Sequence, residues 1–267
     1  AKLLAEAKYA DRDENGYLED ENEKELKINR YVLKEDIYKK MMAGSIPPED
    51  FADELYALGI DVRAGIYAAL CCGIDDYSHA PARSRIDDRY LFKFSLVNIL
   101  EESLSYCNCD IAEIEEGKYI ILLKYDDASN SLLNKNTISG CLKRINNSLK
   151  KYLNISISFG VNTSPAGYAH VREACLKAGT AMKYKFYYGR ESIVFYDDIN
   201  GFIGKGITFE YDNEKILLER LDDFDEAGVK SIINGFYDGI AKSGAFEPDA
   251  VRKVSVEICS SILKFAK

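Results

Sequence analysis

Acidic side chains gather where strand-forming residues give way to turn-forming residues. Asp75 closes the apolar run GIYAALCCGID and is followed by Asp76, while Asp87 and Asp88 come a little further along the chain. Carboxylate oxygens are the ligands that hard divalent cations prefer, so these residues could bind a cation. Short polar side chains also serve as turn and helix-cap residues, and that role is the favoured interpretation.

A second acidic stretch is AEIEEGKYIILLKYDD, residues 112–127. Ile111, Ile114 and residues 119–123 are strand formers, whereas Glu115-Glu116-Gly117 is typical of a tight turn. The pattern predicts a β-hairpin with two carboxylates at its tip. A lysine, Lys118, follows them directly.

Other chemistry-bearing residues give weaker signals. His79 and His170 lie far apart without a matching nucleophile, and the seven cysteines include no CxxC pair. We therefore expect neither a zinc site nor a disulfide framework, but buried free thiols in a reducing compartment. The stretch NGFIGKGIT (200–208) lacks the glycine spacing and the Ser/Thr of a phosphate-binding loop, so a flexible connector is expected.

Composition limits the class of protein. The chain has 267 residues, of which 47% are hydrophobic and 30% charged, so it can bury a sizeable core. Its net charge of −9 argues against a free-standing nucleic-acid binder, although a local basic patch would be compatible with it. There is neither an apolar run of about 20 residues nor a signal peptide. We expect a cytoplasmic fragment of a longer protein, since the chain starts at Ala1 with helical character.

Hydrophobic periodicity from residue 62 predicts the order β-α-β-β-α-β-α-β. The predicted elements are a strand over 65–75, a helix over 89–106, the hairpin, a helix over 136–153, a strand over 154–161, a helix over 168–189 and a strand over 192–199. The helix over 89–106 is expected to bury one stripe, formed by Leu91, Phe94, Leu96, Val97, Leu100 and Leu104. One sheet with helices packed on it, an α/β sandwich of ferredoxin-like type, is the economical arrangement.

Helical segments flank this region. A charged helix over residues 1–45 places Leu26, Leu33, Ile37 and Met41 near one face. It would either pack on the domain or form a coiled coil with a second copy. Helices are also predicted at about 213–223, 225–242 and 248–266. The expected organisation is an N-terminal linker helix (1–45), a central domain (46–200) and a C-terminal helical segment (201–267).

The order of elements, with GIDDY closing the first strand and a turn-centred hairpin next, resembles the GGDEF (diguanylate cyclase) fold over about residues 62–198. In that family the first strand ends in D-x-D-x-F, whose acids hold Mg²⁺, and the hairpin turn carries G-G-D-E-F. A later helix ends A-D-x-A-L-Y-x-A-K-x-x-G-R-N and supplies a lysine for phosphates. The resemblance therefore implies a former nucleotide cleft beside the hairpin turn.

Matched to those motifs, this chain keeps the scaffold and loses the chemistry. Gly73 stands where the first metal Asp should be, while Asp75 survives at the second position. The G-G-D-E-F positions fall on Glu115, Glu116, Gly117, Lys118 and Tyr119. Two carboxylates would repel a triphosphate, and Lys118 replaces the catalytic acid. On the later helix, Gly179 and Phe186 replace the family's Asp and Lys. We expect no catalytic residue, no bound metal and no cofactor.

The stretch from YLNISISFGV to ESIVFYDD, residues 152–198, is similar to the central region of AraC-family two-component response regulators. The resemblance implies a receiver or membrane sensor before this region and a pair of helix-turn-helix motifs after it. Residues up to 267 supply neither of these. It also implies a homodimer, a cognate histidine kinase, and DNA contact only through the missing C-terminal domain.

Three hypotheses follow. The leading one is a non-catalytic regulatory and dimerisation module of an AraC-type transcription regulator, which relays a state change between its flanking helices. The second is a small-molecule sensor whose re-lined former cleft uses Glu115, Glu116 and Lys118 as ligand contacts. The third, a surviving cyclase, conflicts with Gly73, Lys118 and Phe186.

Overall fold

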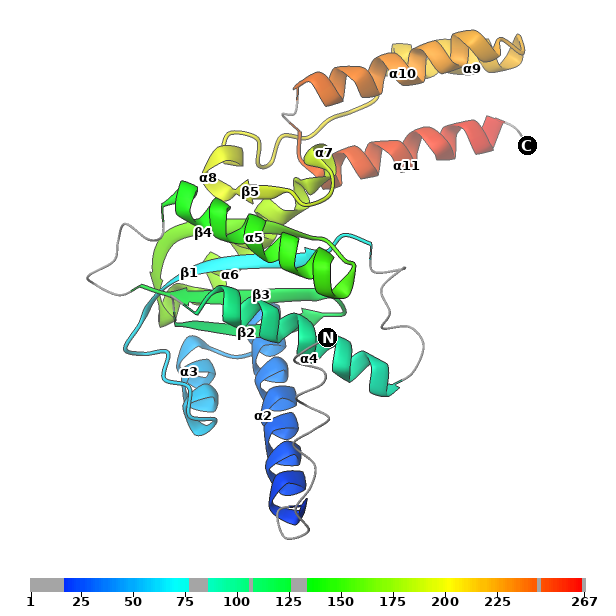
Figure 1. Ribbon diagram of the computed structural model, residues 1–267. Coiled ribbons are helices and arrows are strands. Elements are labelled where there is room, and N and C mark those ends of the chain that lie inside the picture. The colour runs from blue at the N-terminus through cyan, green and yellow to red at the C-terminus, as the bar shows by residue number, and fades with distance from the viewer. Residues whose placement is uncertain (1–16, 77–85, 106–107, 126–133, 244–245, 266–267) are drawn as a thin grey trace.

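The computed structural model describes residues 17–76, 86–105, 108–125, 134–243 and 246–265 (Figure 1). Its centre is a five-stranded sheet in the order β2-β3-β1-β4-β5. The strands are β1 (Ile66–Ile74), β2 (Cys109–Glu115), β3 (Lys118–Lys124), β4 (Ile157–Gly167) and β5 (Ile193–Phe195). The β1 strand is antiparallel to both of its neighbours, β3 and β4, and only β4 and β5 run parallel.

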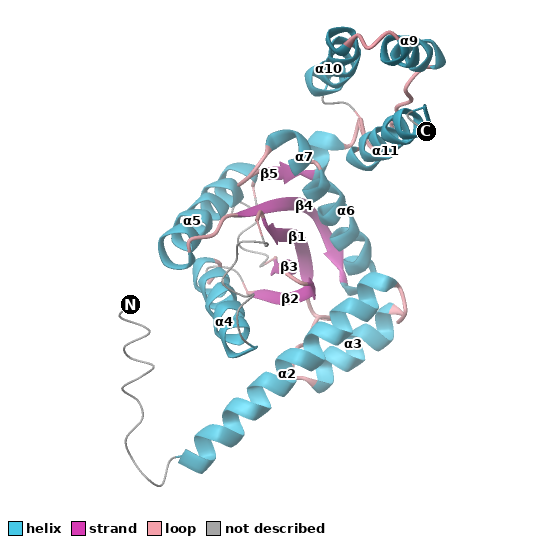
Figure 2. Ribbon diagram, turned by 90° about the vertical axis from the view of Figure 1, so that its right-hand side faces the viewer, coloured by secondary structure: helices cyan, strands magenta, loops and turns pink. Residues whose placement is uncertain are grey.

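Helices cover both faces of the sheet, as Figure 2 shows. On one face lie α4 (Ile86–Ser103) and α5 (Lys135–Leu153). On the other lie α2 (Tyr17–Ala43), α3 (Pro48–Ala57) and α6 (Val171–Lys183). Since β1 lies between two apolar layers, it is buried from Tyr67 to Ile74, which explains its continuous apolar run.

The predicted mixed α/β class and the order β-α-β-β-α-β-α-β are confirmed. Several boundaries differ, among them those of α4, which spans Ile86–Ser103 instead of 89–106. The predicted helix over 168–189 divides into the 3₁₀ turn η3 (Tyr168–His170), α6 and α7 (Lys185–Tyr188), and Gly189 ends it with a φ of +80°. The last strand stops at Phe195, because residues 196–199 turn into the short helix α8 (Tyr196–Ile199). The fourth strand starts at Ile157, since Asn154 caps α5 in the left-handed region, and it continues past its predicted end at 161 to Gly167.

Two helix faces were predicted incorrectly. Leu91 and Phe94 were expected in the buried stripe of α4 but are exposed, whereas Phe92, Leu96 and Leu100 are buried. The buried residues recur every four positions, which leaves Leu91 and Phe94 on the outer flank of the helix.

Leu33 on α2 is likewise exposed, although it was predicted on the same face as Ile37 and Met41. Ile37, Tyr38 and Met41 are the buried residues of α2 in the core that it shares with α3 and α6, and Met42 packs against them. The side chain of Leu26 lies outside the described residues.

The C-terminal segment forms α9 (Tyr211–Asp222), α10 (Glu226–Ser243) and α11 (Pro248–Phe265), within about two residues of the predicted bounds. Leu217, Val254 and Ile258 form its small core. Figure 1 shows these helices beyond the β5 edge of the sheet, whereas α2 extends away from the opposite edge. The two flanking helical parts therefore leave the central domain from different ends.

The close approach of β4 and α6 depends on Gly160. A Cβ atom at this position would overlap the carbonyl oxygen of Ala178 and the backbone nitrogen of Met182. Both obstacles are backbone atoms of one helix, so no side-chain rotation can make room. Only glycine allows α6 to pack this tightly on the sheet.

We expect Gly160→Ala to lower the free energy of unfolding by at least about 3 kcal/mol, because α6 must move off the sheet. Urea titration followed by circular dichroism measures this. The matched control is Gly179→Ala on α6, where a Cβ meets nothing within 4 Å. This control should stabilise the helix by roughly 0.5–1 kcal/mol. Equal effects of the two substitutions would contradict the packing argument.

Candidate functional site

Asp75, which the sequence resemblance matches to the second acid of the family's metal motif, lies just past the end of β1, and its side chain is almost fully buried. Its side chain is 2% exposed. The hydroxyls of Ser156 and Ser158 donate hydrogen bonds to its two carboxylate oxygens at 2.9 and 2.5 Å, and the Glu191 backbone N–H donates a third at 2.9 Å. The Lys185 ammonium lies 3.6 Å from the carboxylate. These groups satisfy and neutralise the carboxylate from within the protein.

Gly73 is the residue that the sequence resemblance matches to the first acid of the metal motif. A Cβ at Gly73 would lie 3.2 Å from the terminal methyl carbon of Met182, so a thioether side chain occupies this space. The sulfur of Met182 lies 3.6 Å from Sγ of Cys71. Burial raises the pKa of the Cys71 thiol to about 12, so the thiolate does not form at neutral pH. The surroundings of Gly73 are apolar and unsuited to Mg²⁺.

The hairpin turn is tied to the end of β1 and to its own strand. The Ile74 backbone N–H donates to the Gly117 carbonyl at 3.0 Å, and the Gly117 N–H donates to the Glu113 carboxylate at 2.9 Å. Gly117 has a φ of +73°, which favours glycine at this position. The turn carboxylates face cations at the surface, since Glu116 pairs with Arg89 and Glu115 pairs with Lys118, both at 3.2 Å.

Glu113 also connects the hairpin to α2 through α4. The Lys93 ammonium on α4 lies 2.7 Å from Glu113 and also pairs with Glu35 of α2. Burial alone would lower the pKa of Lys93, but hydrogen bonds to Glu113 and Glu35 raise it above its usual value. The ammonium therefore remains charged and bridges two carboxylates from different elements.

A second contact fixes α2 to the edge strand β2. Asp110 accepts hydrogen bonds from the Lys34 ammonium at 2.7 Å and from the Tyr38 hydroxyl at 2.6 Å. Burial, followed by the charge of Asp110, raises the pKa of Tyr38 well above its usual value, so the phenol remains a donor. The C-terminal half of α2 is thus attached to the sheet by charged groups as well as by apolar ones.

The residues predicted from the former site do not form one cleft. Glu115, Lys118 and Gly179 line a cavity of about 440 Å³ between the hairpin, α2 and α6. Glu116 pairs with Arg89 instead. Phe186 contacts the C-terminal segment, with the Arg252 guanidinium 5.5 Å from its ring centre. Tyr119 is buried in the core.

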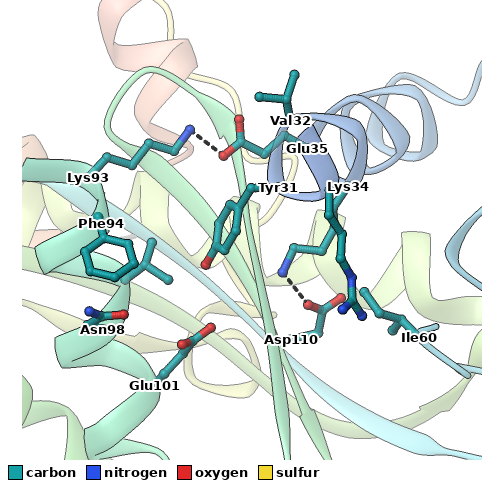
Figure 3. Close-up of a pocket in the computed structure, with 12 residues that line it drawn as sticks. Tyr31, Val32, Lys34, Glu35, Ile60, Lys93, Phe94, Asn98, Glu101 and Asp110 are labelled. Carbon is teal, nitrogen blue, oxygen red and sulfur yellow. Dashed lines mark hydrogen bonds and ion pairs between the residues drawn. The ribbon is translucent and has the colours of Figure 1, made fainter. Parts of the chain in front are cut away.

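Sequence matching missed two features of this region. Lys185, one residue before the aligned lysine position, is the cation nearest Asp75 in the described part of the chain. Its signal was the repeated lysine in KYKFYY. The other feature is a cavity of about 440 Å³ between α2 and α4, which Figure 3 shows. Its residues come from four separated segments, so no motif marks it.

Residues of α6 and α7 contact the C-terminal segment. The Tyr187 hydroxyl donates to the Phe246 carbonyl at 2.9 Å, and Lys183 pairs with Asp249 at the start of α11. The described residues contain no cluster of three or more His, Cys, Asp or Glu side chains that could hold a metal ion. His79 lies outside the described residues, as do the side chains of Asp87 and Asp88.

Comparisons with known proteins assign the chain to no family. No family model matches it, and no curated protein matches it. Among solved structures, the coiled coil and GGDEF domain of DgcB from Caulobacter crescentus with c-di-GMP is 9% identical, with a TM-score of 0.41, covering 72% of this chain and 98% of that one. Diguanylate cyclase SiaD from Pseudomonas aeruginosa with its activator SiaC is 15% identical, with a TM-score of 0.39, covering 73% and 82%.

The active GGEEF domain of a diguanylate cyclase from Vibrio cholerae is 13% identical, with a TM-score of 0.39, covering 56% of this chain and 89% of that one. These structures are of the domain type that the sequence resembles, but similarity at this level carries no conclusion about activity. In the described part of the chain, no helix is both long and apolar enough to cross a membrane.

We expect Asp75→Asn to lower the free energy of unfolding by about 1–3 kcal/mol, because the new amide turns a donor toward the donors that surround it. Urea titration measures this. The control Asp198→Asn removes an exposed partner of Lys135 and should cost less than about 1 kcal/mol. Millimolar Mg²⁺ should leave both midpoints unchanged. Stabilisation of the unmodified protein by Mg²⁺, lost in Asp75→Asn, would show that the carboxylate still binds metal.

Proposed function

We propose that this chain is the non-catalytic regulatory module of an AraC-type transcription regulator, built on a degenerate GGDEF-like domain. The observation that carries the proposal is the environment of Asp75. Its carboxylate is buried and satisfied by Ser156, Ser158 and the Glu191 N–H. Two-metal phosphoryl transfer requires carboxylates that are free to bind Mg²⁺. The acid that remains serves the fold instead.

The contacts of α2 support a role in relaying a change of state. Lys93 links Glu35 on α2 to Glu113, and Glu113 holds the Gly117 N–H of the turn. A shift of α2 would therefore disturb the turn directly. At the other end of the domain, α6 and α7 contact the start of α11 through Lys183 and Tyr187. The domain thus connects two helical segments through contacts that a rigid-body movement can switch.

The wider context rests on the sequence resemblance alone. In that context α2 receives a signal from a receiver or membrane sensor, with a histidine kinase upstream of the receiver. The C-terminal helices pass the signal to a helix-turn-helix domain, and the full-length protein acts as a homodimer.

A small-molecule sensor remains the alternative function. Glu115, Lys118 and Gly179 line one cavity, and a small-molecule ligand could bind there. Incubation with GTP and Mg²⁺ tests the third hypothesis, a surviving cyclase. Any cyclic dinucleotide product would overturn the proposed loss of catalysis.

We expect Lys93→Met to increase hydrogen exchange at the Gly117 amide by roughly tenfold or more, because Glu113 loses the cation that holds it in place. Exchange in α2 around Glu35 should rise together with it. NMR hydrogen exchange measures both sites. The control Lys40→Met removes a lysine of α2 whose ion-pair partners among the described residues, Asp36 and Glu54, are exposed, and it should leave Gly117 unchanged. An unchanged Gly117 amide in folded Lys93→Met would contradict the relay.

We also expect the chain to dimerise through the extended part of α2. Light scattering over a concentration series should show a dimer, and deletion of residues 1–28 should return a monomer. This deletion keeps Ile37, Tyr38 and Met41, which pack against the domain. A monomer at high concentration of the undeleted chain would exclude α2 as a dimerisation element.

A further inference from the structure

The cavity between α2 and α4 has apolar walls, and it is separate from the cavity that Glu115, Lys118 and Gly179 line. Figure 3 shows Tyr31 and Val32 of α2 on one side and Phe94 of α4 on the other. Val32 is 50% exposed and Phe94 is 63% exposed, so apolar surface is open to solvent at its mouth. The cavity volume of about 440 Å³ suits a small organic molecule.

Negative charge is in excess around this cavity. Glu35, Glu101 and Asp110 line it, and Glu113 lies behind it. Lys34 neutralises Asp110, whereas the single charge of Lys93 is shared between Glu35 and Glu113.

Glu101 forms no ion pair within the described residues and is exposed. The remaining cation, Arg30, lies toward Gly59 and the end of α3. Four carboxylates therefore face three cations, and Glu101, on α4, is the carboxylate without a cationic partner among the described residues.

The Tyr31 hydroxyl supplies a polar group inside the cavity. Its oxygen is buried without a well-formed hydrogen bond, and Figure 3 shows it directed toward Asn98 and Glu101. Burial is the main cause of its raised pKa, and the charges of Glu101, Asp110 and Glu35 add to it. The phenol thus remains protonated in a region of negative potential. A hydrogen-bond donor from a ligand would satisfy its oxygen.

We propose that this cavity binds a compact organic cation, an amine with an apolar body. The ammonium group would lie between the Glu101 carboxylate and the Tyr31 oxygen, and the apolar body would cover Val32 and Phe94. An anion of the same shape would meet the excess carboxylates, and a neutral analogue would lose the charge-assisted hydrogen bond. Because α2 forms one wall, the bound amine would stabilise α2 against α4.

Three probes of one shape test the charge requirement: 2-phenylethylamine, 2-phenylethanol and 3-phenylpropionate. Calorimetric titration of the whole chain should show binding of the amine at micromolar to millimolar concentration, at least severalfold weaker binding of the alcohol, and none of the carboxylate. Chemical-shift changes should map to Tyr31 and Phe94. Equal binding of the three probes, or no binding of the amine at millimolar concentration, would overturn the proposal.

Neighbouring residues provide matched variants. Glu101→Gln should weaken amine binding roughly tenfold, the size of one charge-assisted hydrogen bond at a partly exposed site. Glu102→Gln removes the same charge one position away, outside the cavity, and should leave binding unchanged. Phe94→Ala should weaken binding, whereas Leu91→Ala, also exposed on α4, should not.

All four positions are solvent-exposed, so these variants should fold, which circular dichroism checks. If Glu101→Gln and Glu102→Gln bind the amine equally, the proposed position of the ammonium group beside Glu101 is wrong. The test does not depend on the relay proposed above, because it measures binding alone.

Discussion

Two partly buried carboxylates on the edge strand β2 constrain how the helices around it can dock. Asp110 and Glu113 would be costly to bury without partners, because an unpaired charge loses its hydration. Their cations come from different elements: Lys34 lies on α2 and Lys93 on α4. The docking of α2, the position of α4 and the charge balance of the cavity between them all follow from this requirement. The turn depends on it too, since Glu113 also accepts from the Gly117 N–H.

The surroundings of Asp75 show how a buried acidic residue can join several elements of a fold. Asp75 accepts from two hydroxyls and one backbone N–H, and these bonds join β1, β4 and the loop before β5. Such a residue stabilises the fold because removing it would leave buried donors unsatisfied. Its presence in the sequence is therefore weak evidence for metal binding, because a buried carboxylate can also serve as a hydrogen-bond acceptor within the fold.

The order of elements was predictable because it depends on local periodicity. The continuous apolar run of β1, the amphipathic α5 and the turn at Gly117 each carry their own signal. The predicted boundaries were wrong where a helix cap or a short helix ends an element, as at Asn154 and Tyr196. The prediction of which helix face is buried was wrong where apolar residues lie on more than one side of the helix, as for Leu33 and Phe94. Periodicity does not say which apolar residues a neighbouring element will cover.

The sequence by itself determined the mixed α/β order, and it predicts that Gly73, Lys118 and Phe186 stand where the family it resembles carries motif residues. Only the tertiary structure decided that Lys185 neutralises Asp75, that Lys93 bridges α2 and the hairpin strand, and that a cavity opens between α2 and α4. The reason is physical. Strand and helix patterns are set by neighbours along the chain, whereas ion pairs and cavities depend on how distant segments pack against one another.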